Sequence, residues 1–112
     1  MQLTTRKLHN ILVVKCDVDR LDAKVAVDFK TSMAKLINQG NSKILLDIST
    51  VTFIDSSALG AIVSSLKLIG PDGELFIAGA QDPIRKMFKL TRMDRVFRMF
   101  PTEEDALQHI SD

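Results

Sequence analysis

The sequence contains few of the residues from which disulfides and metal sites are built. Its 112 residues include one cysteine, Cys16, and two histidines, His9 and His109. A single cysteine cannot form an internal disulfide, which suits a reducing cytoplasm. The histidines lie near opposite ends of the chain, and no HExxH or CxxC spacing occurs. We therefore expect no dedicated metal site.

Signals for nucleotide and membrane binding are also missing. No GxxxxGK(S/T) or GxGxxG motif is present, so no phosphate-binding loop is predicted. No apolar run approaches the roughly 20 residues that span a bilayer, and the first ten residues lack the apolar stretch of a signal peptide. The net charge of +1 gives no overall attraction to nucleic acid or to an anionic membrane. We expect a cytoplasmic protein without either partner.

The chain does contain alternating strand-like and helix-like segments. Its length and its 46% hydrophobic content predict one globular domain over residues 1–112. Strands are expected at Leu3–Leu8, Ile11–Val18, Lys43–Ile48, Glu74–Ala78 and Val96–Phe100, and helices at the capping residues Asp22, Asp55, Asp82 and Thr102. This order predicts an α/β fold with a mixed, mostly parallel central sheet of four or five strands and about four helices.

Residues 85–98 form the most basic segment, with six Lys or Arg residues and one acid, Asp94. Arg85, Lys89 and Arg92 are spaced to share one solvent face of a helix. Such a face is either an interaction patch for nucleic acid or an acidic partner, or an ordinary solvated surface. The solvated surface is favoured, and a secondary role in meeting an acidic partner stays open.

The stretch TFIDSSALG, residues 52–60, joins a strand-like run to a helical one. Asp55 is expected to cap the helix, which places Ser56 and Ser57 at its first two positions. A phosphoryl group there would meet free backbone amides and the positive end of the helix dipole. Phosphorylation should therefore leave the domain folded and be felt by any protein docked at this surface.

The helix that follows has an unusually neutral face away from its expected core stripe. This face is formed by small or apolar residues, namely Ser57, Ala61, Ser64, Ser65 and Leu68. Lys67 is the only charge between Ser56 and Ile69. The face predicts either a docking surface for another protein or packing under a neighbouring element. Gly60 costs about 1 kcal/mol of helix propensity relative to alanine, which indicates close backbone packing.

Over nearly its whole length the sequence resembles the STAS family, the domain of bacterial anti-sigma factor antagonists. The segment ILLDISTVTFIDSSALGAIVSSLK matches the family order of strand, D-S-(S/T)-x-L-G motif and helix. RLDA at residues 20–23, LFIAGAQDPIRKMFKLTRMDRVF and the terminal TEEDAL support the match. Two departures are Asp19, where the family commonly has glycine, and Ala58, where the motif usually has its first glycine.

The resemblance implies a partner switch without cofactor, metal or catalysis by this chain. The unmodified antagonist binds an anti-sigma factor that is also a serine kinase, or a related switch kinase. Phosphorylation by that kinase releases the antagonist, and a serine phosphatase restores it. The acceptor maps to Ser56, and the predicted partner-binding residues are Asp22, Asp55, Ser56, Ser57, Ala58, Ala61, Ser64 and Ser65. A monomer or weak dimer is expected.

Two other functions remain as alternatives. One is a STAS scaffold subunit of a larger complex, such as a lipid-transport complex, that docks constitutively and is not switched by phosphorylation. The other is a small α/β enzyme that uses Ser56 or Ser57 as nucleophile with Asp55. The enzyme would need a general base, which the sequence does not visibly supply.

Overall fold

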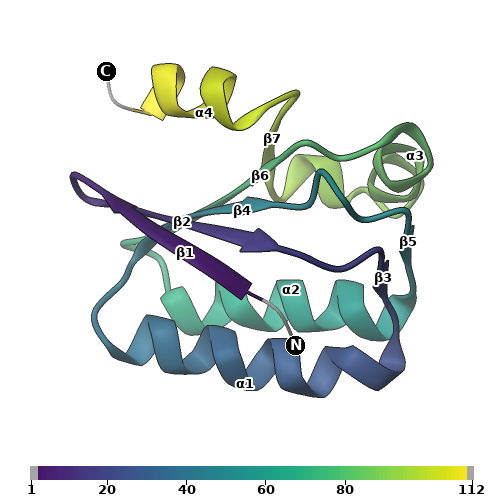
Figure 1. Cartoon of the computed structure of the whole chain (residues 1–112), viewed down its shortest axis with the longest axis horizontal. Helices are drawn as coiled ribbons and strands as arrows, with labels where there is room; N and C mark the ends of the chain where they lie inside the picture. Colours follow the sequence, from purple (N-terminus) through teal and green to yellow (C-terminus); the bar gives the residue numbers. More distant parts are fainter. Residues whose placement is uncertain (1–2, 111–112) are drawn as a thin grey trace.

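Five strands form the central sheet of the computed structural model, which describes residues 3–110 (Figure 1). The elements are β1 (Leu3–Leu8), β2 (Ile11–Cys16), β3 (Arg20–Leu21), α1 (Ala23–Asn38), β4 (Lys43–Asp47), β5 (Phe53–Ile54), α2 (Ser56–Ile69), β6 (Glu74–Ala78), α3 (Asp82–Leu90), the 3-10 turn η1 (Met93–Arg95), β7 (Arg98–Phe100) and α4 (Glu103–Ile110). The sheet order is β1-β2-β4-β6-β7, with β1 antiparallel to β2 and the other pairs parallel. The predicted α/β fold with a mixed, mostly parallel sheet and four helices is confirmed.

Successive residues of each strand point to opposite faces of the sheet. Val14 of β2 pairs with Leu46 of β4, and both pack in the core under α1 and α2. The preceding residue on each strand belongs to a second cluster, which is covered by α4. Because helices lie on both faces, β4 is buried along nearly its whole length, as its continuous apolar run predicts.

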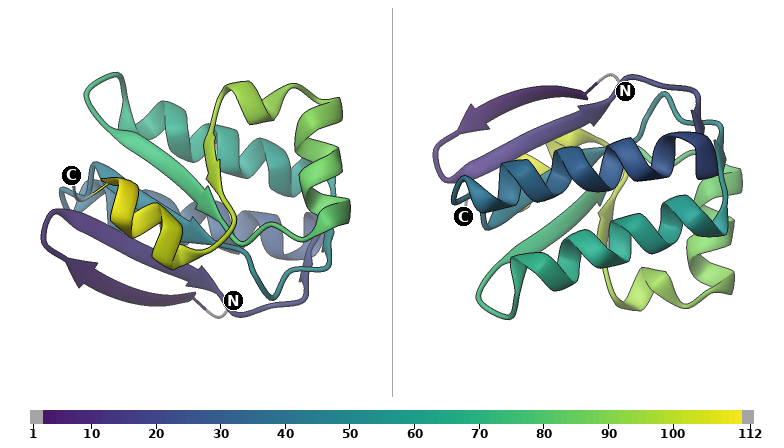
Figure 2. Two further views of the ribbon diagram at one scale, coloured as in Figure 1. Left: turned by 90° about the horizontal axis from the view of Figure 1, so that it is seen from above. Right: turned by 90° about the horizontal axis from the view of Figure 1, so that it is seen from below.

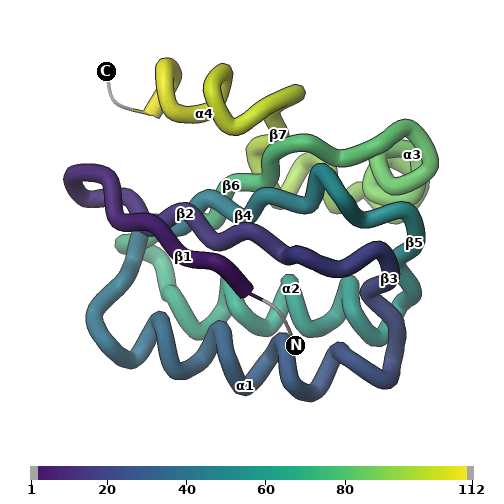
Figure 3. Tube along the Cα trace, in the orientation of Figure 1, coloured from purple at the N-terminus to yellow at the C-terminus, as the bar shows by residue number. Residues whose placement is uncertain are grey.

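The segments that follow β2 and β4 turn toward the same end of the molecule and lie side by side there (Figure 3). They pair as β3 and β5, a separate two-stranded parallel sheet in which Arg20 lies opposite Phe53 and Leu21 opposite Ile54. Each of these short strands leads directly into a helix. Because the carboxyl ends of parallel strands share one edge of a sheet, α1 and α2 begin next to each other.

Several predicted boundaries are wrong by a few residues. The second strand ends at Cys16 rather than Val18 because the chain then leaves the sheet toward β3. The last strand begins at Arg98 instead of Val96, after the 3-10 turn. Gln81, not Asp82, is the cap residue of α3; Asp82 is the first helical residue and is ion-paired with Arg85. The expected Thr102 cap is confirmed, because its hydroxyl accepts from the Asp105 amide at 3.1 Å.

Candidate functional site

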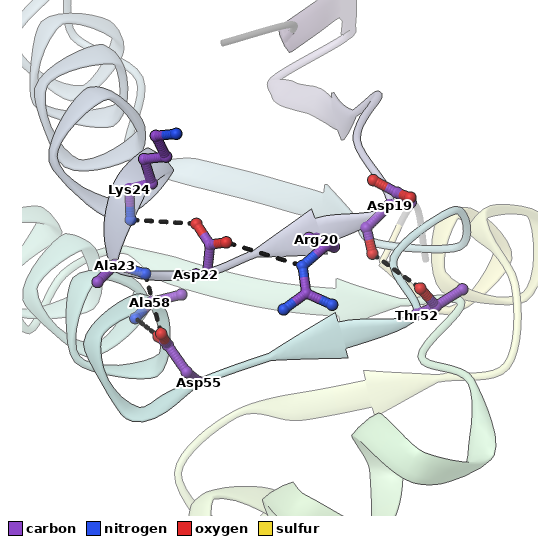
Figure 4. A network of polar contacts seen from close by, with 8 residues as sticks. All are labelled: Asp19, Arg20, Asp22, Ala23, Lys24, Thr52, Asp55 and Ala58. Carbon is purple, nitrogen blue, oxygen red and sulfur yellow. Dashed lines mark hydrogen bonds and ion pairs between the residues drawn. The ribbon is translucent and has the colours of Figure 1, made fainter.

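The starts of α1 and α2 are joined by one carboxylate. The two helices run side by side from the same end of the molecule (Figure 2). Asp55 caps its own helix, accepting from the Ala58 amide at 3.0 Å through Oδ1. Its other oxygen, Oδ2, accepts from the Ala23 amide at 2.9 Å, in the first turn of α1 (Figure 4). Asp55 therefore satisfies otherwise unpaired amides of two helices.

Asp22 is the cap residue of α1, as predicted. Its Oδ1 accepts from the Lys24 amide at 3.1 Å, and Oδ2 lies 3.8 Å from Nε of Arg20. Figure 4 shows the Asp22 and Asp55 side chains at neighbouring helix starts. The site thus combines two positive helix ends with two carboxylates that compensate them.

A single backbone carbonyl fixes the loop that leads to this site. The Asp19 carbonyl accepts from the Thr52 amide at 2.7 Å, from the Thr52 hydroxyl at 3.0 Å and from the Phe53 amide at 3.2 Å. Among the described residues, positive φ outside glycine occurs only at His9 and Arg92. The backbone at Asp19 therefore does not need the glycine that the family commonly has there.

The exposed part of the site lies on the first turns of α2 and α1. Ser56 and Ser57 are exposed at the first two positions of α2, as predicted from the cap. Beside them a shallow depression of about 390 Å³ runs between the helices. It is lined by Ala23, Ala26, Val27, Lys30, Ser57, Gly60, Ala61 and Ser64. Val27 is 70% exposed, so an apolar side chain stands at the rim of this depression.

Three predicted partner-binding residues are not on an exposed face. Ala58, Ala61 and Ser65 are 1%, 5% and 3% exposed, because α2 packs against α1 as well as against the sheet. Ser65 is further used internally, since its hydroxyl donates to the Ala61 carbonyl at 3.0 Å. Ala61 still reaches the floor of the depression.

The close packing expected at Gly60 is not found within the domain. A Cβ built at Gly60 would have no atom within 4 Å, apart from chain neighbours and the backbone of its own helix. Its backbone is not in the left-handed region. Nothing in the described part of the domain therefore requires glycine at this position.

Sequence reasoning missed an exposed aromatic and arginine pair beside the start of α2. The guanidinium of Arg20 lies 4.2 Å from the centroid of the Phe53 ring, which is 39% exposed. The pair is brought together by the β3–β5 register. Arginine stacked on an exposed ring is a frequent component of protein interfaces. No periodicity can reveal it, because each strand is only two residues long.

The two histidines lie on elements other than α2, and the single cysteine is buried. His9 lies in the β1–β2 turn and His109 on α4, both away from the start of α2 (Figure 1). Burial, followed by the charges of Asp47 and Asp17, raises the pKa of Cys16 to about 12, so its thiol is a poor nucleophile. Within residues 3–110, no group of three His, Cys, Asp or Glu side chains is placed to hold a metal ion. None of the described helices has the length and apolar character needed to cross a bilayer.

Comparison of the sequence with known proteins finds a matching family model and several related proteins. The family model described as "STAS domain" matches residues 2–106. A Thermotoga maritima protein, provisionally named an anti-sigma factor antagonist, is 32% identical over 77 residues, which are 68% of each chain. The anti-sigma-B factor antagonist of Staphylococcus aureus is 29% identical over 72 residues, covering 63% of this chain and 67% of that protein.

Solved structures agree with this relationship. The crystal structure of the Thermotoga maritima protein superposes with a TM-score of 0.89 at 25% identity, covering 98% of this chain and 95% of that one. The phosphorylated form of the Bacillus cell fate determinant SpoIIAA has the same fold, with a TM-score of 0.74 at 18% identity over 97% of this chain and 99% of that one. With the family model spanning nearly all of its residues, the chain belongs to the STAS family.

Proposed function

We propose that the protein is an antagonist of an anti-sigma factor and works as a phosphorylation-controlled partner switch. In its unmodified form it binds an anti-sigma factor with serine kinase activity, or a related switch kinase. Phosphorylation of Ser56 releases it, and a serine phosphatase returns it to the binding form. The observation that carries this proposal is the exposure of Ser56 at the first position of α2. It directly follows Asp55, whose carboxylate accepts hydrogen bonds from amides of both α1 and α2.

The surroundings of Ser56 favour a switch that leaves the fold intact. A phosphoserine there carries about −1.5 to −2 charges at neutral pH and lies at the positive end of α2. In the free protein those charges stay in water. In a complex they would have to be desolvated beside the carboxylates of Asp55 and Asp22, whose oxygens already accept from helix amides. Each 1.4 kcal/mol of that penalty weakens binding about tenfold.

The remaining exposed surface suits a protein partner. The depression between α1 and α2 includes Ser57 and the exposed Val27, and the Arg20–Phe53 pair lies on the strands that lead into these helices. We assign partner contacts to Asp22, Asp55, Ser56, Ser57 and Ser64, with Ala61 at the floor. Ala58 and Ser65 act from within the domain, by supporting the helix.

The proposal is tested by incubating the protein with ATP, magnesium and an anti-sigma factor that has serine kinase activity. We expect a mass gain of one phosphate, located at Ser56 by peptide fragmentation. Ser57→Ala is the matched control and should still be phosphorylated, whereas Ser56→Ala should not. Phosphate that persists in Ser56→Ala would assign the acceptor elsewhere.

A binding experiment separates the switch from a constitutive STAS scaffold. The kinase is titrated with wild type, Ser56→Ala and Ser56→Asp, and its tryptophan fluorescence is followed; this chain contains no tryptophan. The switch requires that Ser56→Asp binds at least about tenfold more weakly than Ser56→Ala, with unchanged thermal stability. Equal affinities of the two variants would favour the scaffold.

A further inference from the structure

Positive charge is concentrated in one segment of the chain, residues 85–98. Residues 85–98 hold six of the 15 basic residues and one of the 14 acids, so this segment has a net charge of +5. The rest of the chain, with nine basic and 13 acidic residues, has a net charge of −4. A total charge of +1 therefore conceals two regions of opposite sign.

Four of the six cations surround a hollow at the end of α3. The hollow has a volume of about 650 Å³ and is lined by Lys86, Lys89, Leu90, Arg92, Asp94 and Arg95. The other two cations have contacts of their own, Arg85 with Asp82 and Arg98 with His109. Within residues 3–110, no ion pair engages the four cations that line the hollow. Leu90, in the same lining, is 84% exposed.

Arg92 occupies a backbone position that glycine usually fills. Arg92 directly follows Thr91, the C-terminal cap residue of α3. Its φ of 65° lies in the left-handed region. Helices commonly end in glycine at this position because a side chain is disfavoured there. The C-terminal end of a helix also attracts positive charge, which accounts for Lys89 in the last turn of α3. That attraction does not require a side chain on the strained residue, so the Arg92 guanidinium calls for another role.

We propose that this hollow is a second docking site, which binds an acidic segment of a protein partner with an apolar side chain among its carboxylates. The unpaired cations meet the carboxylates, and Leu90 meets the apolar side chain. The concave shape of the hollow favours an inserted peptide over the flat surface of an anionic membrane. The absence of aromatic side chains from the lining argues against single-stranded nucleic acid, whose bases would stack on them.

This site is separate from the surface proposed around Ser56. None of its lining residues belongs to α1 or α2. α3, which supplies part of its lining, nevertheless lies next to β5, toward the end of the molecule where α2 begins (Figures 1 and 2). A partner could contact both surfaces, yet the second site does not depend on phosphorylation. The two proposals can therefore fail independently.

The test uses the full chain and a fluorescein-labelled peptide, Glu-Glu-Leu-Glu-Asp-Leu-Glu-Glu, followed by fluorescence anisotropy at low salt. Lys89→Glu is compared with Lys35→Glu, because both lysines are exposed in the last turn of a helix. The two substitutions change the net charge and the helix-end electrostatics equally. We expect Lys89→Glu to weaken peptide binding about tenfold and Lys35→Glu less than about twofold.

A second variant guards against loss of binding through unfolding. Arg92→Gly should raise the melting temperature, because it relieves the left-handed residue, and should still weaken peptide binding about threefold or more. Ser56→Asp should leave peptide affinity unchanged. Equal binding by Lys89→Glu and Lys35→Glu would overturn the proposal. So would tighter binding to vesicles containing phosphatidylserine than to the peptide, or undiminished binding of a peptide with serine in place of both leucines.

Discussion

Oδ2 of Asp55 accepts a hydrogen bond from the Ala23 amide at 2.9 Å, across a separation of 32 residues in the chain. The same carboxylate caps α2 through Ala58. One side chain thus stabilises its own helix and fixes the start of another helix against it. This relationship makes Asp55 a structural residue as well as a neighbour of the proposed acceptor.

Replacing Asp55 should cost more stability than replacing the other cap of the site. Asp55→Ala removes one helix cap and a second hydrogen bond, which together are worth about 2 kcal/mol. Asp22→Ala removes a single cap, worth about 1 kcal/mol. Urea unfolding of both variants checks this difference. If Asp55→Ala were no more destabilising than Asp22→Ala, the bond to α1 would contribute nothing.

Gly60→Ala should stabilise the protein by about 1 kcal/mol, because alanine has the higher helix propensity and its Cβ meets no neighbouring atom. Gly79→Ala is the contrasting variant. Gly79 has φ 80°, and its Cβ would lie 2.8 Å from Cβ of Ser49, so the substitution should destabilise the fold. Unfolding midpoints in urea should move in opposite directions. A loss of stability in Gly60→Ala would mean that the glycine is required by the fold.

The contact between Asp47 and Glu103 predicts a pH dependence of stability. The hydrogen bond to Asp47, together with burial, raises the pKa of Glu103 above 4.5 despite Arg6. Although burial opposes it, hydrogen bonding to Glu103 and Ser49 holds the pKa of Asp47 below 3.8. Because the pKa of Glu103 is higher in the folded than in the unfolded protein, Glu103 stabilises the fold at pH values below its unfolded-state pKa. That contribution is lost as the pH rises through its folded-state pKa. The Asp47 contribution has the opposite sign and is lost on acidification below 3.8.

Glu103→Gln keeps a hydrogen-bond donor toward Asp47 but cannot ionise. Its stability relative to wild type should therefore improve as pH rises from 4.5 through the raised Glu103 pKa. The measurement is the free energy of unfolding across that pH range. Glu104→Gln, at the adjacent exposed position, is the control and should show no such trend. A parallel trend in both variants would assign the effect to the helix end rather than to the pair.

Cys16 should be inert in the folded protein. It is 0% exposed, and its pKa is raised to about 12 by burial and then by the nearby carboxylates, so little thiolate forms at pH 8. We expect no reaction with Ellman's reagent under native conditions and one reactive thiol in denaturant. Native labelling at the rate of a free thiol would show that β2 opens readily.

The sequence predicts those features of the site that depend on local rules. Asp22 and Asp55 are recognisable as caps because a helical period begins directly after each of them. The bond from Asp55 to Ala23 is not predictable in this way, because it depends on how two distant helices meet. The α1–α2 contact also explains why Ala61 and Ser65 were misplaced. A single apolar stripe shows which face meets the sheet, whereas packing on a neighbouring helix buries a second face.

The β3–β5 pairing has a consequence for recognition. A peptide that covers residues 52–60 contains Ser56 and Asp55, but it lacks the Ala23 amide and the Arg20 side chain that the folded chain places beside them. The surface is therefore a conformational epitope, assembled from two stretches of chain that are remote in sequence. An enzyme that reads it would distinguish the folded protein from its own unfolded chain, even though both contain the same serine.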